Sequence, residues 1–259
     1  MNPEIAAVIL AAGEGTRIKA RRKNKVTYKL AGKPMIGYVV ETLSKIGIKH
    51  IIVVVKFFEA SVRAALQGRN IIFARQGSKK GTAAALEDAL PGIPKKINQI
   101  LVMYGDDSAF YPVELFQFIL TEHQKYESDV TLLSIKVDNP KGLGRILRGR
   151  DGKVLGIVEE KVATDEQRKI KEINTGCYCF RRDFIEKRIG EIKINPVSQE
   201  YYLTDIVEVA LSHGERVHVC LYPDNSIWHG INDRSQWAKA MRKKKYGEKE
   251  KKEKKEKKD

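Results

Sequence analysis

Residues 6–16 read AAVILAAGEGT, a short apolar run that leads directly into a loop with two glycines, Gly13 and Gly15. An apolar run of this length that ends in glycines is typical of a buried strand entering a loop. Glycines in such a loop allow backbone N–H groups to approach phosphate oxygens, which a Cβ atom would obstruct. The stretch therefore predicts an α/β fold whose first strand leads into an anion-binding loop.

The residues after the glycines indicate which kind of phosphate loop this is. A Walker A loop requires Gly-Lys-Ser/Thr, which is absent, and a dinucleotide loop requires a third glycine where Ile18 stands. Residues 19–33 instead contain seven basic side chains and no acidic one. A long cationic loop suits a triphosphate better than the pyrophosphate of a dinucleotide. An ordinary strand–helix turn remains an alternative for Gly13-Glu14-Gly15 alone, but the adjoining Arg17 and Lys25 count against it.

The remaining sequence alternates between apolar runs and helical periodicity up to about residue 138. This alternation predicts a doubly wound parallel sheet with helices on both faces. The expected strands are 6–10, 50–55, 71–74, 99–104 and 130–137, and the expected helices are 35–46, 59–66, 82–90 and 113–125. After Pro140 short strands at 144–147, 154–159 and 178–180, with no helix between the first two, predict an antiparallel extension. Helical patterns return at 182–189, 202–212 and 234–245, with a strand at 217–222. We expect one α/β domain over residues 1–241, with halves of about 1–138 and 139–241, followed by a basic disordered tail at 242–259.

Composition excludes several classes of protein. The chain has 259 residues, of which 42% are hydrophobic, so it is not a disordered chain, and its three cysteines exclude a disulfide scaffold. No stretch approaches the roughly 20 apolar residues of a membrane helix, and the N-terminus does not resemble a signal peptide, so we expect a cytoplasmic protein. The formal net charge is +15, and the tail contributes eleven basic and five acidic residues to it. The tail is typical of a solvated segment, whereas the basic cluster at 19–33 adjoins the glycine loop.

A series of motifs in fixed order resembles the sugar-1-phosphate nucleotidyltransferase (nucleotide-sugar pyrophosphorylase) family. The likeness is closest to the uridylyltransferase domain of the bifunctional N-acetylglucosamine-1-phosphate uridylyltransferase/glucosamine-1-phosphate acetyltransferases. The matching blocks are LAAGEGTR (10–17), LAGKPM (30–35), Gln76 with Gly81-Thr82, YGD (104–106), GLGR (142–145), IVE (157–159), ATDEQR (163–168), EINTG (172–176), EYYLTDI (200–206) and GIN (230–232). After residue 234 no hexapeptide repeat follows, so we do not expect acetyl transfer.

The resemblance implies a Rossmann-like mixed sheet with a small antiparallel sugar-binding extension, which residues 139–241 would supply. It also implies Mg²⁺-dependent transfer of a nucleotidyl group from UTP to N-acetylglucosamine 1-phosphate, giving UDP-N-acetylglucosamine and pyrophosphate. The implied catalytic residues are Arg17 and Lys25, and the implied metal ligands are Asp106 and Asn232, with Asp107 as an alternative. The implied nucleotide-binding residues are Leu10, Ala11, Ala12, Gly13, Gly15, Thr16, Gln76, Gly81 and Thr82. The implied sugar-binding residues are Tyr104, Gly144, Glu159, Asn174, Tyr202 and Thr204.

Residue chemistry supports these roles. Arginine can bind phosphate oxygens bidentately, and lysine supplies a mobile point charge that offsets the repulsion between two anionic reactants. The attacking phosphate is already ionised, so no general base is needed, and the five histidines show no catalytic spacing. The Gln76 amide offers both a donor and an acceptor, which matches the imide edge of uracil or thymine.

The sequence departs from the family pattern at two places. Asn24 precedes Lys25 where the family commonly has proline, and the loop is one residue longer, so that Lys23 could take the role of Lys25. Asp107-Ser108 replaces an uncharged residue followed by proline.

Several alternatives stay open at this point. The enzyme could use dTTP or glucose 1-phosphate, or the chain could be a non-catalytic regulatory subunit that binds nucleotide sugars. Nucleic-acid binding through the tail is a third hypothesis, against which its five acids and single aromatic residue, Tyr246, count. We expect small-molecule substrates as partners, with no specific nucleic acid and no membrane, and homo-oligomerisation is left open.

Overall fold

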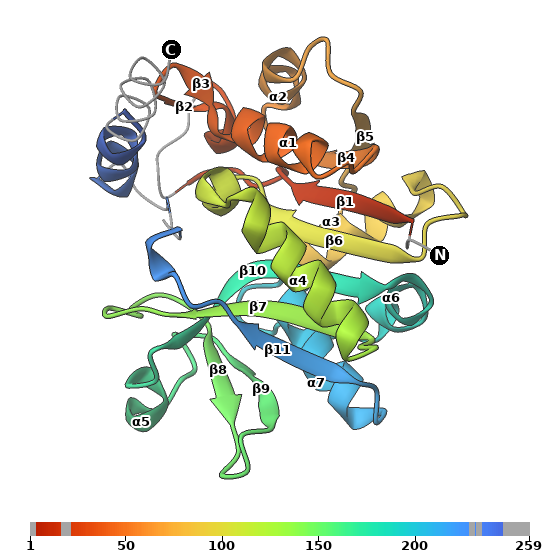
Figure 1. Cartoon of the computed structure of the whole chain (residues 1–259), viewed down its shortest axis with the longest axis vertical. Coiled ribbons are helices and arrows are strands. Elements are labelled where there is room, and N and C mark those ends of the chain that lie inside the picture. Colours follow the sequence, from red (N-terminus) through yellow and green to blue (C-terminus); the bar gives the residue numbers. More distant parts are fainter. Residues whose placement is uncertain (1–3, 17–21, 228–230, 232–234, 246–259) are drawn as a thin grey trace, which may run out of the picture.

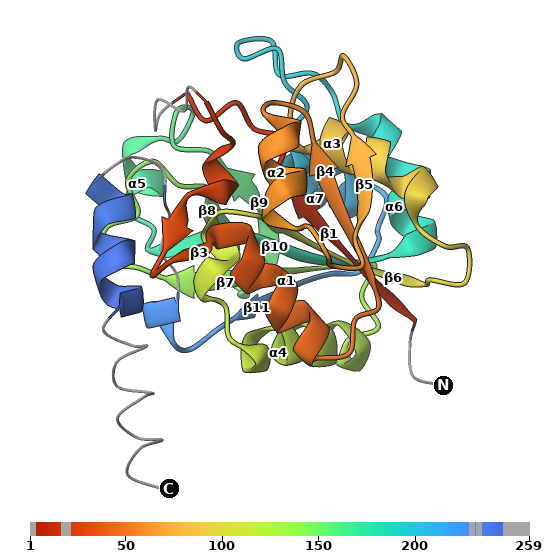
Figure 2. The same cartoon turned by 90° about the horizontal axis from the view of Figure 1, so that it is seen from above.

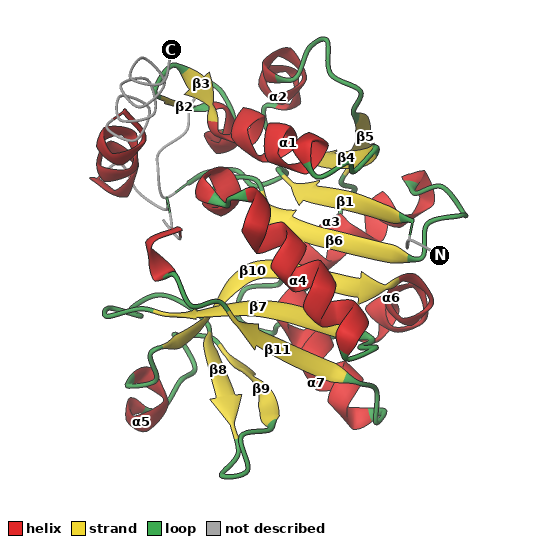
Figure 3. Ribbon diagram, in the orientation of Figure 1, coloured by secondary structure: helices red, strands yellow, loops and turns green. Residues whose placement is uncertain are grey.

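A computed structural model describes residues 4–16, 22–227, 231 and 235–245 of the chain. Within these residues the centre is a nine-stranded sheet, in which seven strands follow the order β11-β7-β10-β6-β1-β4-β5 (Figures 1 and 3). The seven strands are β1 (Ile5–Leu10), β4 (His50–Val55), β5 (Ile72–Arg75), β6 (Gln99–Tyr104), β7 (Val130–Lys136), β10 (Glu172–Arg181) and β11 (Val217–Leu221). A hairpin of β8 (Arg145–Arg148) and β9 (Val154–Val158) extends the sheet from β10.

The sheet is mixed because one strand runs against its neighbours. β1 is parallel to β4 and β6, β4 is parallel to β5, and β7 is parallel to β11. β10 lies between β6 and β7 and is antiparallel to both. The predicted fold class, a doubly wound Rossmann-like mixed sheet with a small antiparallel extension, is confirmed.

Helices cover both faces of the sheet (Figure 2). α1 (Met35–Lys45), α2 (Glu59–Ala65) and α4 (Val113–Lys125) contribute to one core, and α3 (Thr82–Ala89), α6 (Arg182–Arg188) and α7 (Ile206–Ser212) to the other. β1 shows why both cores form: Ala7 and Ile9 belong to the first and Ala6 and Val8 to the second, as the two-residue period of a strand requires. A strand buried on both faces reads as a continuous apolar run, which is how residues 6–10 appear in the sequence.

A third, smaller core covers the sheet edge at which β1 and β6 end. It lies beside the two-residue strands β2 (Lys29–Leu30) and β3 (Lys33–Pro34), which follow the short turn η1 (Lys25–Thr27), and a helix at 235–245 packs into it. Its buried members are Leu30, Met35, Ala109, Ile231 and Ala240. The helix includes the first four residues of the predicted tail, where the Lys244 Nζ donates to the Ala109 carbonyl at 2.9 Å. Residues 246–259 lie outside the described residues.

The structure differs from the sequence-based expectation mainly after residue 140. The predicted strand at 178–180 is the end of the ten-residue β10, whose register with β7 shifts between Asn174 and Tyr178. The predicted helix at 202–212 begins as the 3₁₀ turn η5 (Leu203–Asp205) before α7. The short helix α5 (Asp165–Arg168) and the β2–β3 pair were not predicted. In the part of the chain that the structure describes, no helix combines the length and apolar character needed to cross a bilayer.

Candidate active site

Predicted site residues that the structure describes, among them the glycine loop, Tyr104 and Asp106, lie at the edge of the sheet where β1, β4 and β6 have their carboxyl ends. β10 runs antiparallel, so Asn174 to Gly176, in the first half of this strand, reach the same edge. Ligands of open α/β sheets bind outside the carboxyl ends of the strands. The loops at this edge are therefore the candidate site.

The glycine loop begins directly after β1 and is tied to both neighbouring strands. The Ala11 N–H donates to the Val54 carbonyl of β4 at 2.9 Å, and the Gly105 N–H donates to the Leu10 carbonyl at 3.0 Å. Ala11 and Ala12 are buried, whereas Gly13 and Thr16 are exposed. Gly15 has a φ of +72°, a conformation that glycine adopts without strain. The loop thus leaves β1 buried and emerges at the surface at Gly13; Arg17 lies outside the described residues.

Lys25 and Asp106 form an ion pair between Nζ and Oδ2. Lys25 is the first residue of η1, and Asp106 follows β6, immediately after the Gly105 that is bonded to Leu10. Their side chains are 13% and 19% exposed, so the pair lies just below the surface beside the glycine loop. Lys23 instead places its Nζ 4.8 Å from the centre of the Tyr28 ring. Of the two candidate lysines, the structure brings Lys25 to the aspartate.

The residue after Asp106 is tied to the segment that contains the second predicted metal ligand. The Ile231 N–H donates to the Asp107 Oδ1 at 3.2 Å, and Ile231 is fully buried. Asn232 itself lies outside the described residues. Among the described residues no group of three or more His, Cys, Asp or Glu side chains is arranged to hold a metal.

Gln76 holds the loop that follows β5. Its backbone N–H donates to the Val55 carbonyl at 2.9 Å, and its side-chain Nε2 donates to the carbonyls of Lys79 at 3.0 Å and Gly81 at 3.1 Å. Because both amide hydrogens have partners within the loop, the carbonyl oxygen is the group that this side chain can offer to a ligand. The sequence alone left donor and acceptor equally available.

Gly81 is required at its position by two independent features. Its φ of +105° with a ψ of 169° lies in a region that is essentially restricted to glycine. An added Cβ would also overlap the Tyr201 backbone, with the Tyr201 nitrogen only 2.5 Å away. Hydrogen bonds on both sides fix this approach, from the Tyr201 N–H to the Lys80 carbonyl at 2.9 Å and from the Ala83 N–H to the Tyr201 carbonyl at 3.0 Å.

Thr82 and Tyr104 lie where the two halves of the chain meet. The Thr82 Oγ1 accepts from the Leu203 N–H at 2.9 Å, and the Thr82 side chain lies near the Tyr104 hydroxyl. Gly176, with a φ of +74°, packs so closely on the Tyr104 ring that a Cβ there would overlap it. Burial is the main cause that raises the pKa of Tyr104, so its hydroxyl is neutral and can donate a hydrogen bond.

Glu159, Thr204 and Gly144 form the other side of the site. The Thr204 hydroxyl donates to the Asp205 Oδ1 at 3.4 Å and lies near the Glu159 carboxyl, and an added Cβ at Gly144 would lie 3.2 Å from the Glu159 Oε1. Burial raises the pKa of Glu159, and the nearby Asp205 carboxylate raises it further. The pKa of Asp205 is also raised, again mainly by burial. Asp205 was not predicted as a site residue, although it directly follows Thr204 in the EYYLTDI block.

Asn174 is held by its own strand. Its Nδ2 donates to the Tyr178 hydroxyl at 2.7 Å, its Oδ1 accepts from the Gly176 N–H at 3.0 Å, and its backbone N–H donates to the Gly144 carbonyl at 2.9 Å. These bonds span the irregular part of β10 and join it to the loop before β8. Tyr202 is half-buried at the start of η5.

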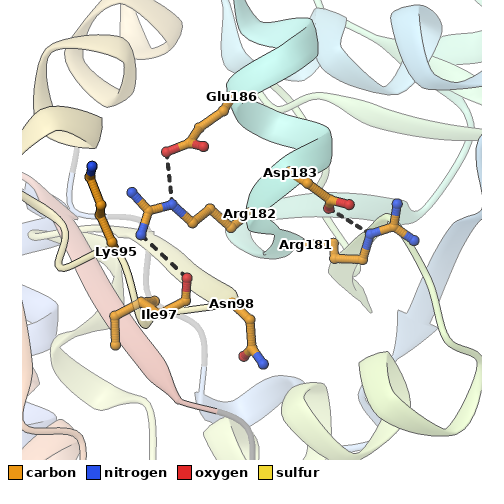
Figure 4. Close-up of a pocket in the computed structure, with 7 residues that line it drawn as sticks. All are labelled: Lys95, Ile97, Asn98, Arg181, Arg182, Asp183 and Glu186. Carbon is orange, nitrogen blue, oxygen red and sulfur yellow. Dashed lines mark hydrogen bonds and ion pairs between the residues drawn. The ribbon is translucent and has the colours of Figure 1, made fainter.

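A hollow of about 600 Å³ lies at the opposite end of β6 and β10 (Figure 4). Its arginines are already paired: Arg181 with Asp129 at 2.8 Å and with Asp183 at 2.6 Å, and Arg182 with Glu186 at 2.7 Å. Arg182 also donates to the carbonyls of Pro94 and Ile97. These contacts join α6 to the turn before β6, so the hollow is a structural joint away from the candidate site.

Comparison with known proteins gives results that agree with this geometry. The proteins named bifunctional protein GlmU from Francisella tularensis subsp. novicida and subsp. tularensis are each 41% identical over 239 residues, which is 92% of this chain and 51% of the relative. The chain thus spans about half the length of these curated relatives. A crystal structure from Bacillus anthracis, described as a glucose-1-phosphate thymidylyltransferase in complex with sucrose, superposes with a TM-score of 0.76 at 21% identity, covering 92% of this chain and 94% of that one.

The Bacillus anthracis structure shows that the fold is shared. The family itself is shown by a match along most of the sequence. The sequence pattern of the family described as nucleotidyl transferase matches residues 6–244, which include both the glycine loop and the segment around Ile231. The chain therefore belongs to the nucleotidyl transferase family.

Proposed function

We propose that the chain is a Mg²⁺-dependent uridylyltransferase that converts UTP and N-acetylglucosamine 1-phosphate into UDP-N-acetylglucosamine and pyrophosphate. The observation that carries the proposal is the Lys25–Asp106 pair, which lies between the glycine loop and the end of β6. The pair supports the proposal because it brings a cation and a carboxylate together beside the loop at which we expect the phosphates of the two anionic substrates to meet. The 41% identity to proteins named bifunctional protein GlmU supports the choice of this member of the family.

The reaction is an in-line displacement at phosphorus. An oxygen of the sugar 1-phosphate attacks the α-phosphorus of UTP, the bond from that phosphorus to the bridging oxygen breaks, and pyrophosphate leaves with the electron pair. No proton has to be removed from the attacking group, because it is already an anion. The protein therefore contributes mainly positioning and charge stabilisation. Lys25 and, as the resemblance implies, Arg17 are the cations for this role.

The carboxylate of Asp106 fits a magnesium ion. Mg²⁺ at nucleotide sites is usually bound by one or two carboxylates while phosphate oxygens and water supply the other ligands, so a cage built entirely of protein groups is not needed. Asp106 would hold the ion, with Asn232 as the second ligand that the resemblance implies. When bound, Mg²⁺ would supply positive charge that offsets the repulsion between the two phosphates.

The arrangement of Gln76 and Gly81 favours binding of a pyrimidine base that carries an imide N–H. The Gln76 carbonyl oxygen is the group left to accept a hydrogen bond, and uracil and thymine present an N3–H donor. The close contact between Gly81 and Tyr201 limits the width of this part of the site. Both features apply to dTTP as well as to UTP, so the nucleotide has to be decided by assay.

Glu159, Thr204 and the Tyr104 hydroxyl are the polar groups that we assign to the sugar. A carboxylate accepts hydrogen bonds from sugar hydroxyls, and Asn174 can donate to or accept from an acetamido group. The hydrogen bond from the Leu203 N–H to the Thr82 Oγ1 joins this region to the start of α3, directly after the loop that Gln76 holds. The sugar and the nucleotide would thus be held by one connected set of groups.

The proposal is tested by measuring pyrophosphate release from the full chain with Mg²⁺. A panel should pair UTP and dTTP with N-acetylglucosamine 1-phosphate and glucose 1-phosphate, and we expect the highest kcat/KM for UTP with N-acetylglucosamine 1-phosphate. Preference for dTTP or glucose 1-phosphate would keep the family chemistry and refute this substrate assignment. Binding of nucleotide sugar without release from any pair would instead support a non-catalytic binding protein.

A further inference from the structure

Asn24 is a buried polar residue at the base of the glycine loop, and the reaction chemistry does not use it directly. Its side chain is 1% exposed. A buried amide is normally retained only where its hydrogen bonds are satisfied, because an unpaired polar group is unfavourable in the interior. The partners of Asn24 therefore indicate what the residue does.

The Asn24 side chain joins three segments that are far apart in sequence. Its Nδ2 donates to the carbonyls of Ala11 at 2.9 Å and Gly13 at 3.2 Å, both in the glycine loop. The same nitrogen donates to the Phe57 carbonyl, in the turn after β4, at 2.9 Å. Its Oδ1 accepts from the Val26 N–H at 3.1 Å and so caps η1, the turn that begins with Lys25.

These bonds fix the direction in which the loop presents its N–H groups. In a trans peptide the carbonyl of one residue and the N–H of the next point to opposite sides. Since the carbonyls of Ala11 and Gly13 point at Asn24, the N–H groups of Ala12 and Glu14 point away from it. An added Cβ at Gly13 would meet no described atom within 4 Å, so the loop is open next to this residue. Backbone N–H groups that point outward from a glycine loop are suited to binding phosphate oxygens.

We propose that Asn24 is a positioning residue that sets the glycine loop and Lys25 in register to receive the triphosphate of the nucleotide. This inference rests on the proposed function, because it assumes that the loop binds a nucleoside triphosphate. Asn24 stands where the family commonly has proline, and its φ of −63° with a ψ of 145° is a backbone conformation that proline can adopt. Asparagine keeps that conformation and adds a side chain with donors and an acceptor, together with a backbone N–H that donates to the Ser61 Oγ at 2.9 Å.

The decisive variant is Asn24→Asp, which keeps the shape and the acceptor but replaces the amide donor by a carboxylate oxygen. That oxygen would face the carbonyls of Ala11, Gly13 and Phe57 and would repel them. We expect the KM for UTP to rise at least roughly tenfold, equivalent to about 1.4 kcal/mol, while the KM for the sugar 1-phosphate changes less than about twofold. A purely structural defect would instead lower the active fraction, and hence kcat, without changing the KM for UTP.

Two further variants provide a second test and a control. Asn24→Pro keeps the φ angle but removes every donor, and we expect it to raise the KM for UTP as Asn24→Asp does. Asn195→Asp is the matched control, because the Asn195 Oδ1 only accepts hydrogen bonds, from the N–H groups of Val197 and Ser198, so a carboxylate can replace it away from the loop. A KM for UTP like that of the wild type in both Asn24 variants would overturn the inference.

Binding of UTP without the sugar substrate, measured by calorimetry, tests the same inference without turnover. We expect weaker binding to the two Asn24 variants than to the wild type and to Asn195→Asp, with thermal unfolding as the check that each variant is folded. A wild type that binds UTP but releases no pyrophosphate would refute the proposed function and leave this inference decided by the binding data. A wild type that binds no UTP would overturn both.

Discussion

Replacing Gly81 by alanine tests whether the loop that follows β5 depends on a close backbone contact. Gly81 has a φ of +105°, and a Cβ there would lie 2.5 Å from the Tyr201 nitrogen and closer still to the Tyr201 carbonyl oxygen. The overlapping atoms belong to backbone, so no side-chain rotation can relieve the contact. We expect the 80–83 and 201–203 segments to separate in Gly81→Ala.

The size of the effect follows from the contacts that would be strained or lost. An L-residue in this region of φ and ψ carries about 1–3 kcal/mol of strain. Separation of the two segments would break the hydrogen bonds from Tyr201 to Lys80 and from Ala83 to Tyr201, each worth about 1 kcal/mol. The free energy of unfolding should therefore fall by about 3–5 kcal/mol, a large part of the total stability of a domain.

Urea unfolding of Gly81→Ala and of a matched control measures this loss. Gly47 has a φ of +84°, but a Cβ added there meets no described atom within 4 Å, so Gly47→Ala carries strain without overlap and should lose only about 1–2 kcal/mol. Under conditions in which Gly81→Ala is still folded, its KM for UTP should rise, because the Gly81 carbonyl accepts from the Gln76 side chain. Equal losses of stability in the two variants would refute the argument from the backbone contact.

Three other predictions concern charge. Asp106→Asn should lower Mg²⁺-dependent turnover by at least about a hundredfold, as measured by pyrophosphate release, while calorimetry should show that UTP still binds through Lys25. Turnover like that of the wild type would exclude Asp106 as a metal ligand. Burial and, next, the Asp205 carboxylate raise the pKa of Glu159, so Asp205→Asn should lower that pKa. In a profile of KM for the sugar 1-phosphate against pH, the rise in KM at acidic pH should then shift to lower pH. A profile like that of the wild type would contradict an interaction between Asp205 and Glu159. Burial lowers the pKa of His123 from its usual 6.5 to about 4, so below pH 6.5 the unfolded chain binds a proton that the folded chain does not. Up to about 3 kcal/mol of stability should thus be lost between pH 6.5 and 4, as measured by urea unfolding, and His123→Gln should be less sensitive to acid; equal sensitivity would count against this cause.

The sequence predicted the parts of the fold that local patterns determine. The apolar runs at β1, β4 and β6 each occupy two cores at once, so their periodicity and burial agree. The position of β10 between β6 and β7 could not be predicted, because Asn174-Thr175-Gly176 interrupts the apolar pattern and strand order is set by contacts between distant segments.

Two smaller features show different limits of the sequence. Thr164 and Gln167 form a capping box around α5, and this signal could have been recognised in the sequence. The role of Asn24 could not, because each partner of its amide nitrogen is a backbone carbonyl brought to it by the fold. The motif blocks predicted which residues form the site, but only the structure shows that Lys25, rather than Lys23, pairs with Asp106.

The junction between the two halves explains how a shared fold can accommodate different substrates. Tyr104 lies near Thr82, packs against Gly176 of β10, and lies close enough to Glu159 for that carboxylate to add to the effect of burial in raising its pKa. If the two sides hold the nucleotide and the sugar as we propose, a change of specificity would alter Gln76 or Glu159 while this contact is kept. In-line transfer requires both substrates to be held at a fixed distance, and the contacts of Tyr104 would help to hold it whichever base or sugar is bound. The fold that this chain shares with a crystal structure at 21% identity does not by itself fix the substrates, because function resides in the residues of the site.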